Sequence, residues 1–559
     1  MRSLFKAKAL VVPAVILLTV AGFVPASGGL AFAQATTGTI RGTVTDQSGA
    51  VVPGASVSAK NEATGVVYPT FKTTSDGIYS IPNLIPGFYT LSVGISGFKT
   101  AVFTSVDVKL GQDSIIDVSL QPGGAAESVT VTATNTEAPI EKDTSQISTN
   151  FDTRQIADLP GNVAGAGLDA IALLVPGVSV GFGNVNTNGT SLSVNGARSR
   201  SNNFTIDGQD NNDNSIGGPS FFENNLDNVA EYQVITNNFS AEYGRNQGAI
   251  VNVVTKSGTN QFHGSGFMFY RDSDLTDSLD NIEKGQEGLT APPLVLYKVF
   301  GGTFGGPIIK DKLFFFGSYQ GIRTSQIFQD ISGVTETPGL AILPSQFAAL
   351  EAAFPNNGIV NALVHDSAFA LSNSQLPPAF AKPGTTVPVS IGGQSFLAAQ
   401  PERDYDSPLA TPSTQNEFLT RIDFKISDKD SLYGRYEYQK ANVENALGDA
   451  LNGWTGNVPS LTQNASVVYT RQLSSRSLND LSFNFTRLFV DFGGGCSGPG
   501  CIPSPGQLNQ AFTNVAFTTA AGADGVGLET LGPAANLPQG RTVTTYQVKD
   551  NYSFLRGAH

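Results

Sequence analysis

Apolar and polar positions alternate with a period of two through much of the second half of the chain. In residues 416–426 one face is mostly apolar and carries Phe418, Thr420, Ile422, Phe424 and Ile426. The opposite face is charged and carries Arg421, Asp423 and Lys425. After the turn SDKD the pattern resumes, with Leu432, Gly434, Tyr436 and Tyr438 opposite Arg435, Glu437 and Gln439. This pattern predicts a β-hairpin with one apolar and one charged face.

Similar hairpins are predicted in residues 297–323 and 465–492. A soluble sandwich would show the same alternation, so the period alone leaves both architectures open. Strands near ten residues, short turns alternating with long loops rich in Gly and Pro, and frequent Tyr and Phe favour a transmembrane β-barrel with a polar lumen. We therefore expect residues 261–559 to form the first strands of an antiparallel barrel.

Residues 38–121 show shorter strands. The segment FYTLSV places Tyr89, Leu91 and Val93 on one face, and turn signals occur at residues 76–77 and 86–87. Phe88, Thr90 and Ser92 fall on the other face. Short strands at this spacing predict a small β-sandwich.

Residues 135–260 mix helical and strand signals. The segment LDAIALLVPGVSV predicts a helix that ends near Pro176 and Gly177, and SLSVNGARSRSNNFTIDG predicts two strands joined by a polar turn. A further apolar strand follows in residues 241–260. We expect a compact α+β globule with mobile loops.

The octet ESVTVTAT, residues 127–134, alternates like a strand but lies between loose segments. It has no neighbouring hairpin signal, so we expect its partner to be another protein. A free strand edge recruits a partner strand through main-chain hydrogen bonds, and alternate side chains supply specificity. Val129 and Val131 would face one way, and Ser128, Thr130 and Thr132 the other. The alternative is a last strand of the preceding sandwich.

Residues 1–33 have the pattern of a signal peptide. Arg2, Lys6 and Lys8 precede the apolar run ALVVPAVILLTVAGF, and residues 31–33 fit a small-x-small cleavage site. A transmembrane anchor is the alternative, but the run is shorter than the roughly 20 residues of a spanning helix and contains Pro13. Later apolar runs are shorter still, so any membrane insertion is expected to use β-strands.

Composition narrows the function classes. The 559 residues imply several domains, and charged residues make up 14% of the chain against roughly 25% in soluble domains. The net charge is −13 and Lys and Arg do not cluster, which argues against nucleic-acid binding. This composition indicates neither a disordered chain nor an ordinary cytosolic enzyme. Together with the strand patterns above, we expect an exported protein of the mainly β fold class.

Enzyme signatures are missing from the sequence, so we predict neither catalysis nor a cofactor. His263, His365 and His559 are the only histidines, and the zincin, serine-hydrolase and P-loop motifs do not occur. The segment GAGLDA resembles a dinucleotide fingerprint but does not follow a buried strand. Cys496 and Cys501 lie in a Gly- and Pro-rich stretch, where an exported chain is expected to form a small-loop disulfide rather than a redox site.

The segment DGQDNNDN, residues 207–214, is rich in oxygen ligands and could bind Ca²⁺. An EF-hand register from Asp210 finds Ser215 where Gly is needed and Phe221 where Glu is needed. These departures favour a solvated loop and no metal.

Residues 38–121 resemble the carboxypeptidase regulatory-like domain, a transthyretin-like sandwich grouped with carbohydrate-binding-like folds. The resemblance is specific for fold and silent on ligand. The matching residues are Gly42, Val44, Asp46, Gly49, Pro53, Gly54, Ala55, Val57, Asp76, Gly77, Tyr79, Leu84, Pro86, Gly87 and Tyr89.

Nearly all of the chain after residue 33 resembles the TonB-dependent outer-membrane transporters of the Oar-like type. The most specific pieces are LLVPGVSV, SVNGARSRSNNFTIDGQDNND, NNFSAEYGRNQGAIVNVVTKSGTNQFHGSGFMFYR and FGGPIIKDKLFFFGSYQG. The resemblance implies a plug domain, residues 135–260, inside a 22-stranded barrel. It places Asn195, Arg198, Arg200, Asp207, Asp210 and Asp213 in plug loops. It also implies a TonB box of Glu127, Ser128, Val129, Thr130, Val131, Thr132 and Ala133.

The implied function is uptake of an unidentified solute, with carbohydrate among the candidates, across the outer membrane of a Gram-negative-type bacterium. The implied partners are outer-membrane lipid and TonB, which would deliver proton-gradient energy to a box and sandwich in the periplasm. The alternative is a surface adhesin or carbohydrate-binding protein that uses the sandwich and the long loop at 324–410 without transport. Signal transduction through the N-terminal extension is a third hypothesis. About eight barrel strands can be counted, fewer than the family's barrels contain, so we expect a C-terminally incomplete barrel.

Overall fold

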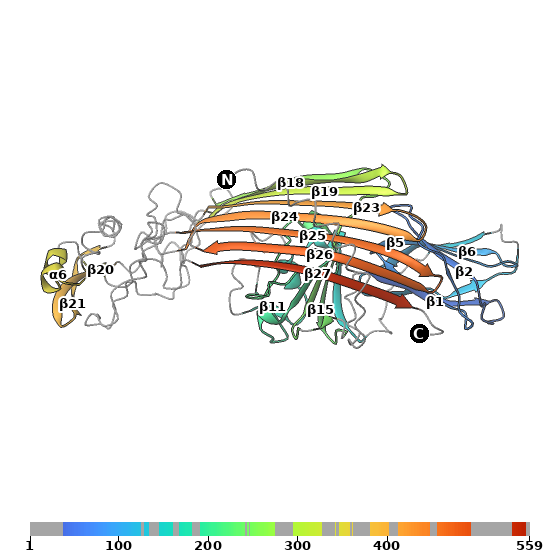
Figure 1. The fold of residues 1–559 in the computed structure, drawn as a ribbon, viewed down its shortest axis with the longest axis horizontal. Coiled ribbons are helices and arrows are strands. Elements are labelled where there is room, and N and C mark those ends of the chain that lie inside the picture. Colours follow the sequence, from blue (N-terminus) through green and yellow to red (C-terminus); the bar gives the residue numbers. More distant parts are fainter. Residues whose placement is uncertain are drawn as a thin grey trace, which may run out of the picture.

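The structure is a computed structural model of the chain (Figure 1). It describes residues 37–123, 128–132, 145–159, 167–181, 191–240, 243–244, 246–273, 295–326, 341–342, 346–357, 360, 381–401, 412–447, 456–492 and 539–554. The signal-peptide prediction and the predicted disulfide of Cys496 and Cys501 lie outside these residues.

The first body is a two-sheet sandwich, called the sandwich below. One sheet has the order β4-β1-β7 with β8 also paired to β1, and the other has the order β3-β2-β5-β6-β9. Tyr89, Leu91 and Val93 are fully buried between the sheets while Phe88 is 56% exposed, which confirms the predicted alternation. The strands are β1 (Gly38–Asp46), β2 (Ser56–Asn61), β3 (Phe71–Lys72), β4 (Ile78–Leu84), β5 (Gly87–Gly94), β6 (Thr100–Val108), β7 (Asp113–Ile115), β8 (Val118–Leu120) and β9 (Ser128–Thr132).

The second body, called the inner domain, is built on a mixed sheet with the order β10-β15-β16-β13-β14. Its strands are β10 (Ile147–Asp152), β11 (Val178–Val180), β12 (Leu192–Val194), β13 (Asn203–Ile206), β14 (Gln209–Asp210), β15 (Val229–Asn237) and β16 (Ile250–Thr255). Its helices are α2 (Thr153–Asp158), α3 (Asp169–Ala172), η1 (Ser199–Ser201) and η2 (Leu226–Asn228). The α+β prediction is confirmed.

Helix α3 is shorter than predicted. The apolar residues Leu168, Ile171, Ala172 and Val175 do bury in the inner-domain core, at the i, i+3, i+4 and i+7 spacing of a helix. Pro176 disfavours helical backbone at the residue before it, so the chain leaves the helix at Ala172 and continues as turns.

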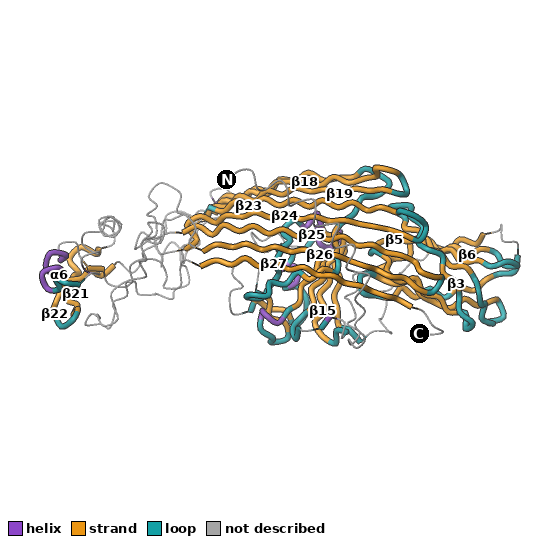
Figure 2. The backbone as a smooth tube through the Cα atoms, in the orientation of Figure 1, coloured by secondary structure: helices purple, strands orange, loops and turns teal. Residues whose placement is uncertain are grey.

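The third body, called the curved sheet, is an antiparallel sheet in simple sequence order that arches over the inner domain (Figures 1 and 2). Among the described residues it contains β17 (His263–Asp272), β18 (Val295–Ile309), β19 (Leu313–Gln326), β23 (Ser413–Lys425), β24 (Asp430–Leu447), β25 (Gly456–Ser474), β26 (Ser477–Phe492) and β27 (Gln539–Phe554). Within this described part the sheet is open, with β17 and β27 at its two edges.

The predicted two-faced strands are confirmed in the curved sheet. Arg421 pairs with Arg435 and both are buried toward the inner domain, whereas Ile422 pairs with Gly434 and is 52% exposed. Three consecutive phenylalanines of β19 alternate in the same way: Phe314 and Phe316 are buried, and Phe315 is only half-buried. In β23 and β24 the polar face therefore meets the inner domain and the apolar face points outward, whereas in β19 Phe314 and Phe316 lie on the inward face.

The two ends of the curved sheet differ. One end has short turns, at residues 310–312, 426–429 and 475–476, and the sandwich lies at this end (Figure 1). The other end carries the long connections, including one between β19 and β23 that was predicted as a loop. That connection contains β20 (Ala341–Ile342), α6 (Phe347–Ala353), β21 (Ala381–Ile391) and β22 (Gln394–Pro401), which form a small sheet with one helix. In the described residues no helix is long and apolar enough to cross a membrane.

Candidate functional site

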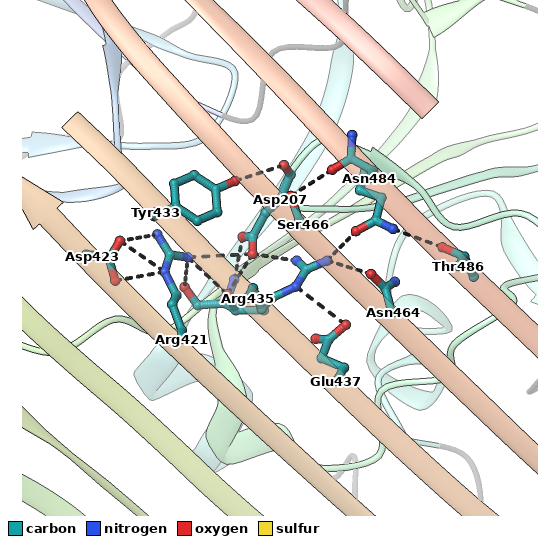
Figure 3. Close-up of polar contacts among 12 residues, drawn as sticks. Asp207, Arg421, Asp423, Tyr433, Arg435, Glu437, Asn464, Ser466, Asn484 and Thr486 are labelled. Atoms are coloured by element: carbon teal, nitrogen blue, oxygen red, sulfur yellow. Dashed lines mark hydrogen bonds and ion pairs between the residues drawn. The ribbon is translucent and has the colours of Figure 1, made fainter. Parts of the chain in front are cut away.

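A two-residue turn carries Asp207 from the inner domain to the curved sheet. Ile206 of β13 pairs with Gln209 of β14, which leaves Asp207 and Gly208 as the turn. Both turn residues have positive φ, 46° and 74°. Asp-Gly is a preferred sequence for such a turn, because Gly adopts positive φ without steric cost and Asp tolerates it. The turn places the Asp207 carboxylate against two arginines of the curved sheet (Figure 3).

Arg435 of β24 and Arg421 of β23 hold this carboxylate. Arg435 donates from Nη1 to Asp207 Oδ2 at 2.5 Å, and Arg421 Nη1 lies 3.5 Å from the same oxygen. Thr255 donates to both carboxylate oxygens, from its backbone N–H at 2.9 Å and its hydroxyl at 2.7 Å. Arg421 also forms a two-pronged contact with Asp423 and stacks over the Tyr433 ring, with 4.5 Å from its guanidinium carbon to the ring centre. We call Asp207, Arg421 and Arg435 the clamp.

The clamp fixes the ionised form of Asp207. Burial alone would raise the pKa of this carboxyl, but Arg435, Arg421 and the Thr255 hydrogen bonds together hold the pKa below its ordinary value. Arg435 has further acceptors in Gln209 and Asn464, at 2.7 and 3.0 Å from Nη2. Its buried Nε has no hydrogen-bond partner among the described residues and lies 3.6 Å from Glu437. Separating the pair is costly, because it leaves a charge alone in the interior.

The rest of the predicted Ca²⁺ or solvated loop also docks on the curved sheet. Asp213 is 2% exposed and lies 3.1 Å from Nε of Arg541 in β27. Asp210 accepts hydrogen bonds from Asn212, and its backbone N–H donates to Gln547 in β27. The expectation of a solvated loop is therefore wrong for Asp207 and Asp213. The reason is that their carboxylates face guanidinium groups more than 200 residues away in the sequence.

A second buried contact joins the inner domain to β23 and β24. Glu223 is 4% exposed and accepts from Asn228 at 2.9 Å, and the backbone oxygen of Phe222 accepts from Gln439 at 2.8 Å. Burial, followed by the nearby charge of Glu417, raises the pKa of Glu223 well above its ordinary value. A protonated Glu223 removes one of two like charges from this contact.

The remaining predicted loop residues lie apart from the clamp. Asn195, with φ of 50°, donates from its side chain to the backbone oxygen of Thr236 at 2.9 Å and lines a cleft of about 420 Å³. Arg198 directly precedes η1, and Arg200 lies within it and is exposed. The structure therefore does not gather the six predicted residues into one site.

Strand β9 corrects the expectation that the octet has no partner in its own chain. Ser128–Thr132 pairs in parallel with β6 of the sandwich, from Thr100 opposite Ser128 to Thr104 opposite Thr132. This is the alternative of a last sandwich strand. Glu127 and Ala133 lie outside the described residues. Whether the segment binds TonB stays a prediction.

The sandwich contacts both other bodies. The backbone N–H of Leu110 donates to Glu231 at 2.9 Å, and its backbone oxygen accepts from Gln233 at 2.9 Å and Asn150 at 3.0 Å. Asn260 donates from its backbone to the oxygen of Ala63 at 3.0 Å. The Asn83 side chain also donates to Asp480 of β26. The sandwich is thus fastened to the inner domain and to the short-turn end of the curved sheet.

A cavity of about 740 Å³ lies among the three bodies. Tyr68 and Phe88 line it from the sandwich and Lys256 from the end of the inner domain. Asp207, Arg421 and Tyr433 also line it, so the clamp forms part of its wall. Opening the clamp would change the shape of this cavity.

Sequence reasoning did not single out Arg421, Arg435 and Arg541 as functional residues. The first two stood on the predicted charged face, a signal that they point inward. Their partners could not be found from sequence, because the period of a strand gives the direction of a side chain and not what docks opposite it.

Comparisons with known proteins agree on three consecutive regions. Residues 39–121 match the carboxypeptidase regulatory-like domain, residues 141–251 the TonB-dependent receptor plug domain, and residues 254–559 the outer membrane beta barrel domain. TonB-dependent transporter Oar from Myxococcus xanthus is 31% identical over 307 residues, which are 52% of this chain and 27% of that protein.

Solved structures of outer-membrane receptors are also similar. The transporter YddB from Escherichia coli has 11% identity and a TM-score of 0.42, covering 73% of this chain and 45% of its own. The ferric enterobactin receptor PfeA from Pseudomonas aeruginosa has 14% identity and a TM-score of 0.40, covering 72% and 45%. The chain spans less than half the length of these relatives.

Proposed function

The chain belongs to the outer-membrane β-barrel proteins with a TonB-dependent receptor plug domain, and from this premise we propose that it serves TonB-driven uptake of a solute. The matched families are receptors and transporters, not enzymes. The inner domain corresponds to the plug and the curved sheet to barrel wall. The proposed energy source is the proton gradient, delivered through TonB.

One observation carries the proposal: a folded plug fills the concave side of the sheet and is tied to it by buried polar contacts. The clamp at Asp207 and the contact of Asp213 with Arg541 join residues of the plug to three strands of the sheet. Polar contacts of this kind hold the plug against the sheet without a continuous apolar core shared by the two. A pulling force can therefore rearrange the plug while the wall stays folded.

The orientation follows from the two ends of the sheet. Outer-membrane barrels have short periplasmic turns and longer extracellular loops. On this rule the sandwich and β9 lie in the periplasm, on the side from which TonB acts. Solute would enter from the long-loop end and leave past the clamp into the 740 Å³ cavity.

A substitution in β9 tests the proposal. Val131→Pro removes a main-chain donor and fixes φ in the segment proposed as the TonB box. We expect it to abolish capture of the purified periplasmic domain of the host's TonB by the detergent-solubilised protein. Val131→Thr keeps a β-branched donor and is the matched control, which should retain capture. Unchanged capture by the proline variant would refute the box assignment.

A non-transporting adhesin is the second candidate. The folded unit of α6 and β20 to β22 at the long-loop end offers a surface for a partner outside the cell. Adhesion would not depend on the proton gradient, whereas TonB-driven uptake would stop when an uncoupler collapses it.

A further inference from the structure

The pairing of β9 with β6 makes the sandwich a binding partner of the segment that TonB is proposed to bind. We propose that β6 is an intramolecular competitor for TonB: it holds the box in a docked form from which TonB must displace it. This inference rests on the proposed function, because it assumes that β9 is the TonB contact.

The first support is the match of side chains along the two strands. In a parallel pair, registered residues point to the same face. Val129 stands opposite Ala101 and Val131 opposite Phe103, and both β6 residues pack against the sandwich core. The polar residues of β9 point to the other face of the sheet, where Thr130 is registered with Val102 of β6. The box valines thus continue an apolar row of the sandwich.

The second support is that β6 offers a pairing edge of limited length. Ser105 has φ of 57°, and the pairing of β6 with β5 shifts register between the partners of Leu91 and Tyr89. Such a bulge interrupts pairing along a strand. The β6 edge before the bulge runs from Thr100 to Thr104, and β9 occupies all of it.

The third support is the tether. The residues before β9 are fixed beside the start of β6, since Lys99 donates to the oxygen of Gln121 at 2.8 Å and Gly123 to that of Gly97 at 3.2 Å. Residues 124–127 alone then connect this anchor to Ser128. A short tether gives an effective concentration of the order of millimolar, so even weak pairing keeps β9 docked.

The docked form is also easy to open. Val129 is half-buried, Val131 is 44% exposed, and the polar residues Ser128 and Thr130 are exposed. Main-chain hydrogen bonds therefore supply most of the contact, and these can be exchanged for equivalent bonds to a partner strand. TonB could contact the apolar face formed by Val129 and Val131 only after β9 leaves β6.

A reversible lock tests the inference. Val102→Cys with Thr130→Cys places two cysteines at registered positions on the outer face, in a chain whose Cys496 and Cys501 are replaced by Ser. Registered Cα atoms on neighbouring strands lie about 4.8 Å apart, within disulfide range. The matched control is Thr104→Cys with Thr130→Cys, two residues out of register and about 8 Å apart, which should not bridge.

We expect the oxidised, locked protein to capture TonB's periplasmic domain at least about tenfold more weakly than the same sample after reduction, because the competent form is removed. Recovery on reduction shows that the variant is folded. Equal capture before and after reduction, or failure of the registered pair to bridge, would overturn the competitor role. If the reduced and unmodified proteins both failed to capture TonB, the proposed function would fall, and this inference with it.

Discussion

Asp207 shows how a short turn couples two parts of the molecule. It stands at the tip of a two-residue turn, where only four atoms of side chain separate the plug backbone from the wall. Because Arg421 and Arg435 come from adjacent strands, their paired register brings both guanidinium groups to one carboxylate. The contacts of the clamp therefore form only when the plug turn lies against β23 and β24.

Arg435→Met is expected to lower the free energy of unfolding by about 3–5 kcal/mol, since it leaves Asp207 and Glu437 as buried carboxylates short of a partner. The measurement is urea unfolding in detergent, followed by the loss of heat-modifiable migration. Arg471→Met is the control, because Arg471 is 55% exposed and its contacts with Asp430 and the Tyr469 hydroxyl, at 3.7 and 3.4 Å, lie near a turn. It should leave the unfolding midpoint unchanged, and equal losses in both variants would contradict a special role for the clamp.

Glu231 should make stability depend on pH. Burial raises its pKa from 4.5 to about 7, against the hydrogen bonds from Asn150 and Leu110, while Asp107 raises it further and Lys109 lowers it. Between pH 4.5 and about 7 the Glu231 carboxyl keeps its proton in the folded protein and loses it in the unfolded chain. The contribution of Glu231 to stability is therefore fully present below about pH 4.5, falls as the pH rises to about 7, and is constant above.

Glu231→Gln should remove this dependence. The difference in urea midpoint between the unmodified protein and the variant should be larger at pH 5 than at pH 8. Asp158→Asn, at an exposed acid of the same domain, should show no such change in difference. Parallel pH profiles for the unmodified protein and Glu231→Gln would contradict the assignment.

At the scale of elements, the strands of the wall follow from a period of two. Ile422 and Phe418 of β23 and Phe483 of β26 point outward, while the lumen face meets the plug. In β23 and β24 the inner face carries Arg421, Asp423, Arg435 and Glu437, where arginines meet carboxylates, and the outer face carries Phe418 and Tyr436. This division is what a lipid-facing wall requires.

A charge on the outer face should be costly far from the turns. Phe483 is exposed and lies about six residues into β26 from the β25–β26 turn. Phe483→Arg is expected to destabilise the wall by about 2–4 kcal/mol in lipid vesicles. Leu473→Arg, at the turn itself, should cost much less because its guanidinium reaches the interface. Equal effects, measured by urea unfolding in vesicles, would contradict a lipid-facing outer surface.

Many of the strands and turns, and the faces of the strands, could be predicted from the sequence. The alternation in residues 416–439 gave the inward and outward residues, and the Asp-Gly pair is a turn signal that the structure uses. The unit at β20 to β22 was missed, although Gly392 and Gly393, both with positive φ, mark its hairpin. The pairing of β9 was mispredicted, because its partner β6 lies 28 positions back in the chain and a parallel pair leaves no local turn signal.

At the scale of the whole molecule, the three bodies form a chain of attachments. The sandwich holds β9 along β6, contacts the plug through Leu110 and contacts the wall through Asn83. It also contacts Asn260, in the segment between β16 and β17. The plug in turn contacts the wall through the clamp. A force applied at β9 would act first on the sandwich, then on β10 of the plug and only then on the clamp. This order predicts that TonB binding precedes any change at Asp207.

TonB-driven uptake through this protein requires that β9 contact TonB in living cells, and this contact can be measured directly. A photo-cross-linking amino acid at position 131, with a control at the exposed position 51 on the far sheet of the sandwich, would be activated in energised cells and the products probed for TonB. We expect a TonB adduct from position 131 and none from position 51. An adduct-free position 131 in cells that carry both proteins at normal levels would contradict TonB-driven uptake through this protein.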